Sequence, residues 1–250
     1  MPFANGMYCS IHEGGPLSQP PVILLHGAGS DRLCWPAAIR RLPGQRVIAL
    51  DLPGHGRSES VALQSIDAYA ESVVNFMSGL GIYQVSLVGH SMGAAIALTL
   101  ALHHPERVAR LAVISGGAAL DIPSDILTAL SNPTSLKEGI GLMRGVLFGP
   151  QADANLQELV MGKVAEMRQG VLYGDWLACS RFDVRDKVAQ IKAPTWVAGG
   201  DHDRLTPPYQ ARYLAQKIKK AGLKIISKGG HMLILEKPHE LCRGLLDFLN

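Results

Sequence analysis

A serine flanked by two glycines lies where one apolar stretch ends and another begins. Gly89-His90-Ser91-Met92-Gly93 fits the pattern G-x-S-x-G, with an expected strand before it and an expected helix after it. Such a turn holds the serine in a strained conformation with Oγ exposed, and side chains in place of the two glycines would strike the neighbouring strand and helix. A glycine-bounded turn without chemistry is the alternative. The pattern predicts that Ser91 is a nucleophile.

A serine hydroxyl is a weak nucleophile at neutral pH, so Ser91 needs a general base. Nine histidines are available. His231 follows the expected strand 223–228 and a glycine pair, which puts it at the carboxyl edge of the sheet, where Ser91 is also expected. We therefore predict His231 as the base.

The base in turn needs an acid to orient it, and the loop 199–207 offers two. Asp201 is more simply explained as a turn residue that bonds nearby backbone N–H groups. Asp203 is therefore the predicted partner of His231. The chain order is then serine, aspartate, histidine, which is the order expected for the strand–turn–helix type of serine site.

Acyl transfer also needs donors for a developing oxyanion. We expect the N–H groups of Met92, which follows the nucleophile, and of Ala28, in the glycine-rich stretch 22–32. His26 is expected to shape that loop through hydrogen bonds. The loop does not fit dinucleotide binding, because Arg32 stands where the third glycine would be. There is no P-loop pattern and no zinc-ligand spacing, so neither a cofactor nor a metal is expected.

The elements that must position these residues are visible as alternating patterns. Apolar runs predict buried strands of a sheet covered on both faces, at 22–26, 46–50, 84–89, 110–116, 194–200 and 223–228, with a possible N-terminal strand at 8–12. Apolar residues at spacings of three and four predict helices between them, at 65–81, 92–104, 207–220 and 236–249. This alternation predicts an α/β fold with a doubly wound, mostly parallel sheet.

Residues 121–187 break the alternation, because they contain no clear strand and are rich in Leu and Met. We expect a helical cap, or lid, inserted into a core formed by residues 1–120 and 188–250; extra helices packed on the outside are the alternative. Apolar cap residues that could line a substrate pocket are Leu127, Leu130, Met143, Leu147, Met161, Met167, Tyr173 and Trp176.

Composition narrows the class of protein. Of the 250 residues 47% are hydrophobic and 18% charged, with a net charge of +3, so a sizeable core is expected and disorder is not. The lysines at 217–228 read as the solvated side of a helix and a strand, with a docking patch for an acidic partner as the alternative. No basic stripe with interleaved aromatic residues indicates nucleic acid.

The expected location is the cytoplasm. The N-terminus lacks a signal-peptide pattern, the longest apolar run, at 94–102, is too short to span a bilayer, and the four cysteines are far apart, as suits reduced thiols. A secreted precursor that has lost its leader remains an alternative. The sequence makes no prediction of oligomeric state.

Several stretches together resemble the α/β-hydrolase superfamily: LLHGAGS, DLPGHGRS, GHSMGAAIAL, GGDHDRLTPP and GGHMLILEKP. The resemblance covers nearly the whole chain outside 121–187. It implies that the insertion is a cap domain and that the serine, aspartate and histidine form a catalytic triad. It also implies that 51–58 is a tight loop near the rim of the active site, in which Asp51, His55 and Ser58 are structural.

The expected activity is that of a serine esterase. Haloalkane dehalogenases and epoxide hydrolases carry aspartate at the nucleophile position, so Ser91 disfavours those chemistries. We expect a carboxylesterase that cleaves a small to medium carboxylic ester through an acyl-enzyme intermediate. The alternatives are a thioesterase, a carbon–carbon bond hydrolase or lactonase on the same fold, an acyl-carrier-protein methyl ester esterase, a cofactor-free peroxidase-like enzyme, and a non-catalytic receptor.

Overall fold

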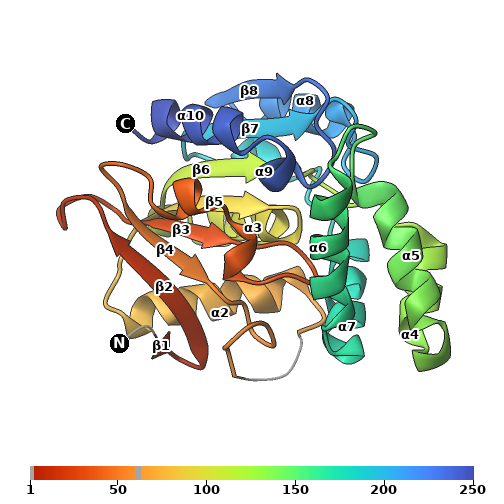
Figure 1. Cartoon of the computed structure of the whole chain (residues 1–250). Coiled ribbons are helices and arrows are strands. Elements are labelled where there is room, and N and C mark those ends of the chain that lie inside the picture. The colour runs from red at the N-terminus through yellow and green to blue at the C-terminus, as the bar shows by residue number, and fades with distance from the viewer. Residues whose placement is uncertain (1–2, 60–62) are drawn as a thin grey trace.

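One mostly parallel sheet organises the chain. The computed structural model describes residues 3–59 and 63–250, and in this part eight strands pair in the order β1-β2-β4-β3-β5-β6-β7-β8 (Figure 1). Only the β1–β2 and β2–β4 pairs are antiparallel. The strands are β1 (Phe3–Ala4), β2 (Met7–Glu13), β3 (Val22–Leu25), β4 (Arg46–Leu50), β5 (Val85–His90), β6 (Val108–Ile114), β7 (Thr195–Gly200) and β8 (Ala221–Ile226). The predicted doubly wound α/β fold is confirmed.

Helices cover both faces of the sheet. One face is covered by α2 (Ile66–Gly79), α3 (Met92–His103) and α8 (Pro208–Lys217), and the other by α1 (Ala37–Arg40), α9 (Leu233–Glu236) and α10 (Pro238–Leu249). Successive side chains of a strand point to opposite faces, so Ile23 and Leu25 join the first core while Val22 and Leu24 join the second. All four are fully buried, as predicted for a strand of a parallel sheet.

The two central helices follow from their sequences. In α2 the apolar spacing buries one face, and the Ser65 side chain begins the helix by accepting the Ala68 N–H at 3.1 Å. Helix α3 is different, because every residue from Met92 to Ala101 is buried. It packs between α2 and the strands on either side of β5, which explains its uniformly apolar and alanine-rich sequence.

Strand β8 corrects one expectation. We predicted that 223–228 would be buried on both faces, but Leu223 and Lys224 are exposed and most of the strand lies at the surface. The reason is its place at the end of the strand order, where it pairs with β7 alone. The lysines alternating with apolar residues were the sequence signal for this half-exposed edge.

Four α-helices follow β6 and precede β7: α4 (Ser124–Ser131), α5 (Leu136–Leu147), α6 (Ala154–Ala165) and α7 (Gln169–Ser180). Figure 1 draws them together beyond the arrowheads of the parallel strands. They share a hydrophobic cluster of their own, which includes Leu130, Met143 and Leu172. Among the described residues, none of the helices is both long and apolar enough to cross a membrane.

Candidate active site

The turn between β5 and α3 holds Ser91 in a strained backbone conformation, with a positive φ of 55° and ψ of −119°. Crowding explains both flanking glycines. A Cβ at Gly89 would lie 2.2 Å from the Gly93 carbonyl oxygen, and a Cβ at Gly93 would lie 2.1 Å from the Leu25 carbonyl oxygen of β3. The sequence argument about these two positions is confirmed. The turn thus fixes Ser91 at the carboxyl edge of the sheet, 8% exposed.

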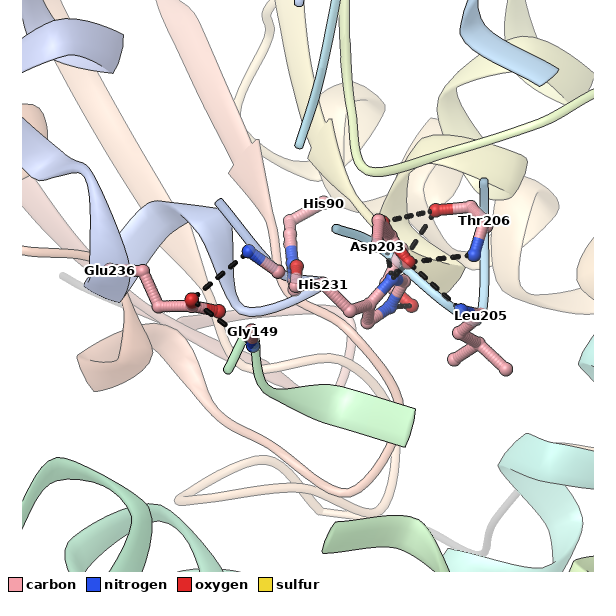
Figure 2. A network of polar contacts seen from close by, with 9 residues as sticks. His90, Gly149, Asp203, Leu205, Thr206, His231 and Glu236 are labelled. Atoms are coloured by element: carbon pink, nitrogen blue, oxygen red, sulfur yellow. Dashed lines mark hydrogen bonds and ion pairs between the residues drawn. The ribbon is translucent and has the colours of Figure 1, made fainter. Parts of the chain in front are cut away.

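His231 reaches this serine from the loop after β8. Its Nε2 lies 2.8 Å from the Ser91 Oγ, and the ring is almost completely buried. On its other side Nδ1 lies 2.9 Å from the Asp203 Oδ2. Figure 2 draws His231 and Asp203 side by side. The structure therefore brings Ser91, His231 and Asp203, which are far apart in sequence, into one hydrogen-bonded row.

The Asp203 carboxylate is held by its own loop. Oδ1 accepts the backbone N–H groups of Leu205 and Thr206 at 2.9 and 2.8 Å, and Oδ2 accepts the Thr206 hydroxyl at 2.7 Å (Figure 2). Burial alone would raise the pKa of Asp203, but the neighbouring His231 and the Thr206 donors lower it below its ordinary value. The group therefore stays ionised and able to accept from the imidazole.

Asp201 has a different setting. It is exposed, and its Oδ1 lies 2.9 Å from the Nδ1 of His202, which is also exposed. It forms no hydrogen bond or ion pair with His231, whose Nδ1 faces Asp203 instead, in keeping with the prediction of a turn residue. The two aspartates of this loop thus differ in burial and in the histidine with which they pair.

The loop after β3 approaches the serine from the opposite side. A Cβ at Gly27 would lie 3.2 Å from the Ser91 Cβ, and Ala28 lines the same cavity as Ser91. Within the described residues the Ala28 N–H bonds no acceptor. Met92 is the first residue of α3, so its N–H has no intrahelical partner either. Among the described residues, neither of these two N–H groups therefore has a protein acceptor.

His26 shapes this loop, as expected. Its Nε2 accepts the Leu52 N–H at 3.0 Å, so its Nδ1–H donates to the Gly27 carbonyl at 2.9 Å. Burial lowers the pKa of His26 well below its ordinary value, and the nearby His55 adds to the effect. His26 is therefore a neutral structural tether between the loops after β3 and β4.

Two residues that the sequence analysis missed hold His231 in place. The His90 Nε2–H donates to the His231 carbonyl at 2.9 Å, and burial lowers the pKa of His90 to about 3, so it acts as a neutral donor. Glu236 accepts the N–H groups of Gly230 and Gly149 at 3.0 and 3.3 Å (Figure 2). The second of these lies between α5 and α6. No sequence pattern pairs His90 with His231 or Glu236 with Gly149, because these contacts join distant segments.

A cavity of about 600 Å³ opens above Ser91 and His231. Its floor is the edge of the sheet, and its far wall is one face of α6. That wall has the helical spacing that could have identified it from sequence: Leu156, Leu159, Val160, Lys163 and Val164, with Met167 just beyond the end of the helix. Most of the lining is apolar.

The predicted pocket residues divide into two groups. Leu147, Met167 and Trp176 line the cavity. The cavity lining does not include the other five, which belong to the hydrophobic cluster shared by α4, α5, α6 and α7: Leu127, Leu130, Met143, Met161 and Tyr173. Four helices that stand away from the sheet must first bury a core of their own, and apolar spacing alone cannot tell that core from a ligand-facing wall.

The loop 51–58 is built by its own polar contacts. Asp51 accepts the Arg32 guanidinium at 2.6 Å and the Arg57 N–H at 2.9 Å, and Ser58 donates to the Asp51 carbonyl at 2.6 Å. His55 faces a buried carboxylate, Asp175 of α7, at 2.8 Å. Among the described residues, no cluster of three or more His, Cys, Asp or Glu side chains could hold a metal ion.

Comparison with known proteins gives one family. A model of the "Alpha/beta hydrolase family" matches residues 22–243. A 2-hydroxy-6-oxononadienedioate/2-hydroxy-6-oxononatrienedioate hydrolase from Comamonas testosteroni is 30% identical over 256 residues, covering 91% of this chain and 87% of that protein.

Solved structures agree with this match. A thermophilic esterase is 29% identical with a TM-score of 0.81, covering 98% of this chain and 94% of its own. The enol-lactonase from Burkholderia xenovorans LB400 has a TM-score of 0.87 and covers 98% of both chains. At 23% identity, the latter likeness concerns the fold alone.

Proposed function

Since the chain belongs to the alpha/beta hydrolase family, we propose that it is a serine hydrolase that cleaves a small to medium carboxylic ester through an acyl-enzyme intermediate. The observation that carries this proposal is the hydrogen bond of 2.8 Å between the His231 Nε2 and the Ser91 Oγ at the floor of the cavity. A serine hydroxyl that meets an unprotonated imidazole nitrogen can lose its proton as it attacks a carbonyl.

In the first half of the reaction Ser91 Oγ attacks the ester carbonyl while His231 Nε2 takes its proton. Asp203 keeps the Nδ1 proton facing its carboxylate and stabilises the imidazolium that forms. His231 then gives the proton to the leaving alkoxide, and an alcohol departs. The acyl group remains on Ser91.

The carbonyl oxygen becomes negative in this step, and the N–H groups of Met92 and Ala28 stabilise it. Both lie beside the serine, and the N-terminus of α3 adds its favourable dipole. Removing one such donor typically costs about 2.7–4 kcal/mol of transition-state stabilisation.

In the second half His231 activates a water molecule, which attacks the acyl-enzyme. The tetrahedral oxygen returns to the same two donors, and the acid is released as Ser91 regains its proton from His231. Besides the substrate and this water molecule, the cycle uses the three side chains and the two backbone amides.

The segment 121–187 acts as a cap over a core of residues 1–120 and 188–250. The apolar face of α6 that lines the cavity supports this role, as does the position of α4, α5, α6 and α7 beyond the carboxyl ends of the strands. Among the residues expected from sequence, the substrate-binding residues of the cap are Leu147, Met167 and Trp176, and an apolar acyl or alcohol group suits this lining. Four free cysteines support a reducing compartment such as the cytoplasm.

Carbon–carbon bond hydrolysis is the second candidate. The observation that favours it is the likeness over nearly the whole chain to the Comamonas testosteroni hydrolase, whose name describes dienedioate and trienedioate substrates. The same serine, imidazole and amide donors would serve, with a carbon leaving group in place of an alcohol.

A panel of carboxylic esters, lactones, thioesters and vinylogous diketo acids, with product analysis, tests the proposal. Ester cleavage must release an alcohol and an acid, whereas carbon–carbon cleavage releases no alcohol. We expect hydrolysis of esters that is abolished in Ser91→Ala. Turnover of the diketo acids alone would replace the ester proposal by the second candidate, and ester turnover unchanged in Ser91→Ala would remove both.

A further inference from the structure

A buried carboxylate on the cap lies next to the loop that supplies one oxyanion donor. Asp175 of α7 is completely buried, and three donors from other parts of the chain surround it. Its Oδ2 accepts the Gly29 N–H and the His55 Nε2–H, each at 2.8 Å, and its Oδ1 accepts the Tyr69 hydroxyl at 2.6 Å. One side chain therefore joins the cap to the loop after β3, the loop 51–58 and helix α2.

The hydrogen bonds define the charges in this cluster. The His55 Nδ1 lies 2.9 Å from the Pro53 carbonyl and its Nε2 faces Asp175, so both nitrogens must carry protons. Burial alone would lower the pKa of His55, but the Asp175 carboxylate and the hydrogen bonds outweigh it and raise the pKa. Burial and Asp175 raise the pKa of Tyr69, which stays a neutral donor. The cluster is a buried carboxylate–imidazolium pair with a phenol beside it.

Gly29, which donates its N–H to Asp175, is the residue next to Ala28. Gly29 has a left-handed backbone, with φ of 63°, and a Cβ there would lie 2.6 Å from the Leu172 Cδ1 of α7. The Gly29 N–H points to Asp175, while the preceding N–H, that of Ala28, stays unbonded within the described residues. Helix α7 thus holds the turn through the hydrogen bond of Asp175, and its Leu172 leaves no room for a side chain at Gly29.

Stability alone does not account for such an arrangement. A buried ion pair loses hydration on both groups, and well-packed apolar side chains of similar volume often stabilise a fold as well or better. The Asp175 carboxylate also accepts a hydrogen bond from the loop beside the nucleophile, so the pair can fix the position of that loop. Position matters there, because misplacing an oxyanion donor by a fraction of an ångström weakens its effect on the transition state.

We propose that Asp175 is a positioning residue, which holds the Gly29 turn so that the Ala28 N–H faces the oxyanion formed at Ser91. This inference rests on the proposed function, and it makes the cap part of the catalytic geometry as well as a cover for the cavity. A substrate that moves α7 would also move the oxyanion donor.

The test compares Asp175→Ala, Asp175→Asn and Tyr69→Phe with the natural protein, all checked for folding by circular dichroism and thermal melting. Asp175→Ala removes the acceptor of the Gly29 N–H. Asp175→Asn keeps one carbonyl oxygen for that N–H if its nitrogen faces Tyr69. Tyr69→Phe disturbs the same cluster without touching the loop and controls for lost stability. Asp175→Ser, which is too short to reach Gly29, replaces Asp175→Ala if the latter does not fold.

Two readouts report on the oxyanion site. The first is kcat on an activated ester and on its thionoester, whose sulfur gains little from oxyanion donors. The second is inhibition by an alkyl boronic acid, whose tetrahedral adduct with Ser91 uses those donors. We expect kcat of Asp175→Ala on the ester to fall by roughly 30-fold or more with KM little changed, the ester-to-thionoester ratio to fall, and boronate inhibition to weaken in parallel. Asp175→Asn should recover most of the loss, and Tyr69→Phe, which keeps the acceptor of the Gly29 N–H, should lose far less than Asp175→Ala.

Equal losses in Asp175→Ala and Tyr69→Phe, or an unchanged ester-to-thionoester ratio and boronate affinity, would overturn the positioning role. The boronate arm keeps this result separate from the proposed function. A natural protein that binds the boronate but does not cleave the ester contradicts the ester proposal, while the comparison among its variants still decides the role of Asp175.

Discussion

The His231 imidazole is fixed by partners on both ring nitrogens and on its own backbone. Ser91 lies at Nε2, Asp203 at Nδ1, and His90 holds the carbonyl. The buried Asp203 is therefore the group that sets which nitrogen carries the proton. This arrangement separates the roles of the two aspartates in the loop after β7.

Asp203→Asn should reduce kcat by on the order of 10⁴-fold, because an amide can stabilise the wrong tautomer of His231 and cannot stabilise the imidazolium. The measurement is steady-state hydrolysis of an activated ester at neutral pH. Asp201→Asn is the matched control, since Asp201 lies two positions away but is exposed. A larger loss in the control than in Asp203→Asn would contradict the assignment.

At the scale of the elements, the turn between β5 and α3 depends on the close approach of β3. An added methyl group at Gly93 would lie 2.1 Å from the Leu25 carbonyl oxygen, which is backbone and cannot rotate away. Gly93→Ala should therefore lower the free energy of unfolding by at least about 1–3 kcal/mol, or prevent folding, because strand and helix must separate. Urea denaturation measures this.

Gly141→Ala provides the control for that substitution. Gly141 lies in α5, with no atom within 4 Å of an added Cβ. Alanine is a better helix former than glycine by about 1 kcal/mol, so this variant should be as stable as the natural protein or more stable. Equal stability of the two variants would contradict the packing described for the serine turn.

Glu236 links the His231 loop to the segment between α5 and α6, and its ionisation should weaken the fold. Burial raises the pKa of Glu236 above its ordinary value of 4.5, against the opposing effect of its backbone donors and His231. The folded state therefore binds this proton more tightly than the unfolded chain does. The resulting stabilisation is complete below the unfolded pKa and is lost as pH rises through the folded pKa.

Glu236→Gln removes that dependence while it keeps an oxygen for Gly230 and Gly149. The melting temperature of the variant minus that of the natural protein should increase as pH is raised from about 4 to 7. Glu138→Gln, at an exposed glutamate, provides the control. Its melting temperature minus that of the natural protein should be nearly constant over this pH range. A difference for Glu236→Gln that does not vary with pH would refute the expectation.

The elements themselves were largely predictable from sequence. Strand β3 is a continuous apolar run, and helix α2 has apolar residues at spacings of three and four, so each can be recognised from its own residues. Their observed bounds lie within two residues of the prediction. Strand β8 was misjudged because apolar content does not report which strand lies at the edge of a sheet. That property depends on the order in which distant strands pair.

The whole molecule creates its site where two separately packed units meet. Ser91 and His231 come from the sheet edge, and Val160 comes from the facing wall of α6. The row of Ser91, Asp203 and His231 was predictable because each follows a strand at the same edge. The hydrogen bonds of Asp175 with Gly29 and of Glu236 with Gly149 could not be predicted, because they join segments more than 80 residues apart.

Val160→Phe should shorten the range of acyl chains that the enzyme accepts, because the larger side chain projects from α6 into the cavity. We expect kcat/KM to fall for long-chain esters and to change little for acetate esters, measured across a chain-length series. Met161→Leu is the control. Met161 is the next residue but is buried in the cluster among α4–α7, and a swap of similar volume there is tolerated.

A loss confined to long chains in Val160→Phe, with the natural profile in Met161→Leu, would support α6 as the wall that limits substrate length. The same profile in all three proteins would place the acyl chain elsewhere in the cavity.

Covalent capture of the nucleophile tests the central claim most directly. The natural protein is treated with a fluorophosphonate, digested and mapped by mass spectrometry, alongside Ser91→Ala and His231→Ala. We predict one modified residue, Ser91, in the natural protein, no modification in Ser91→Ala and much slower modification in His231→Ala. An unmodified Ser91, or a label that persists on another residue in Ser91→Ala, would contradict the account.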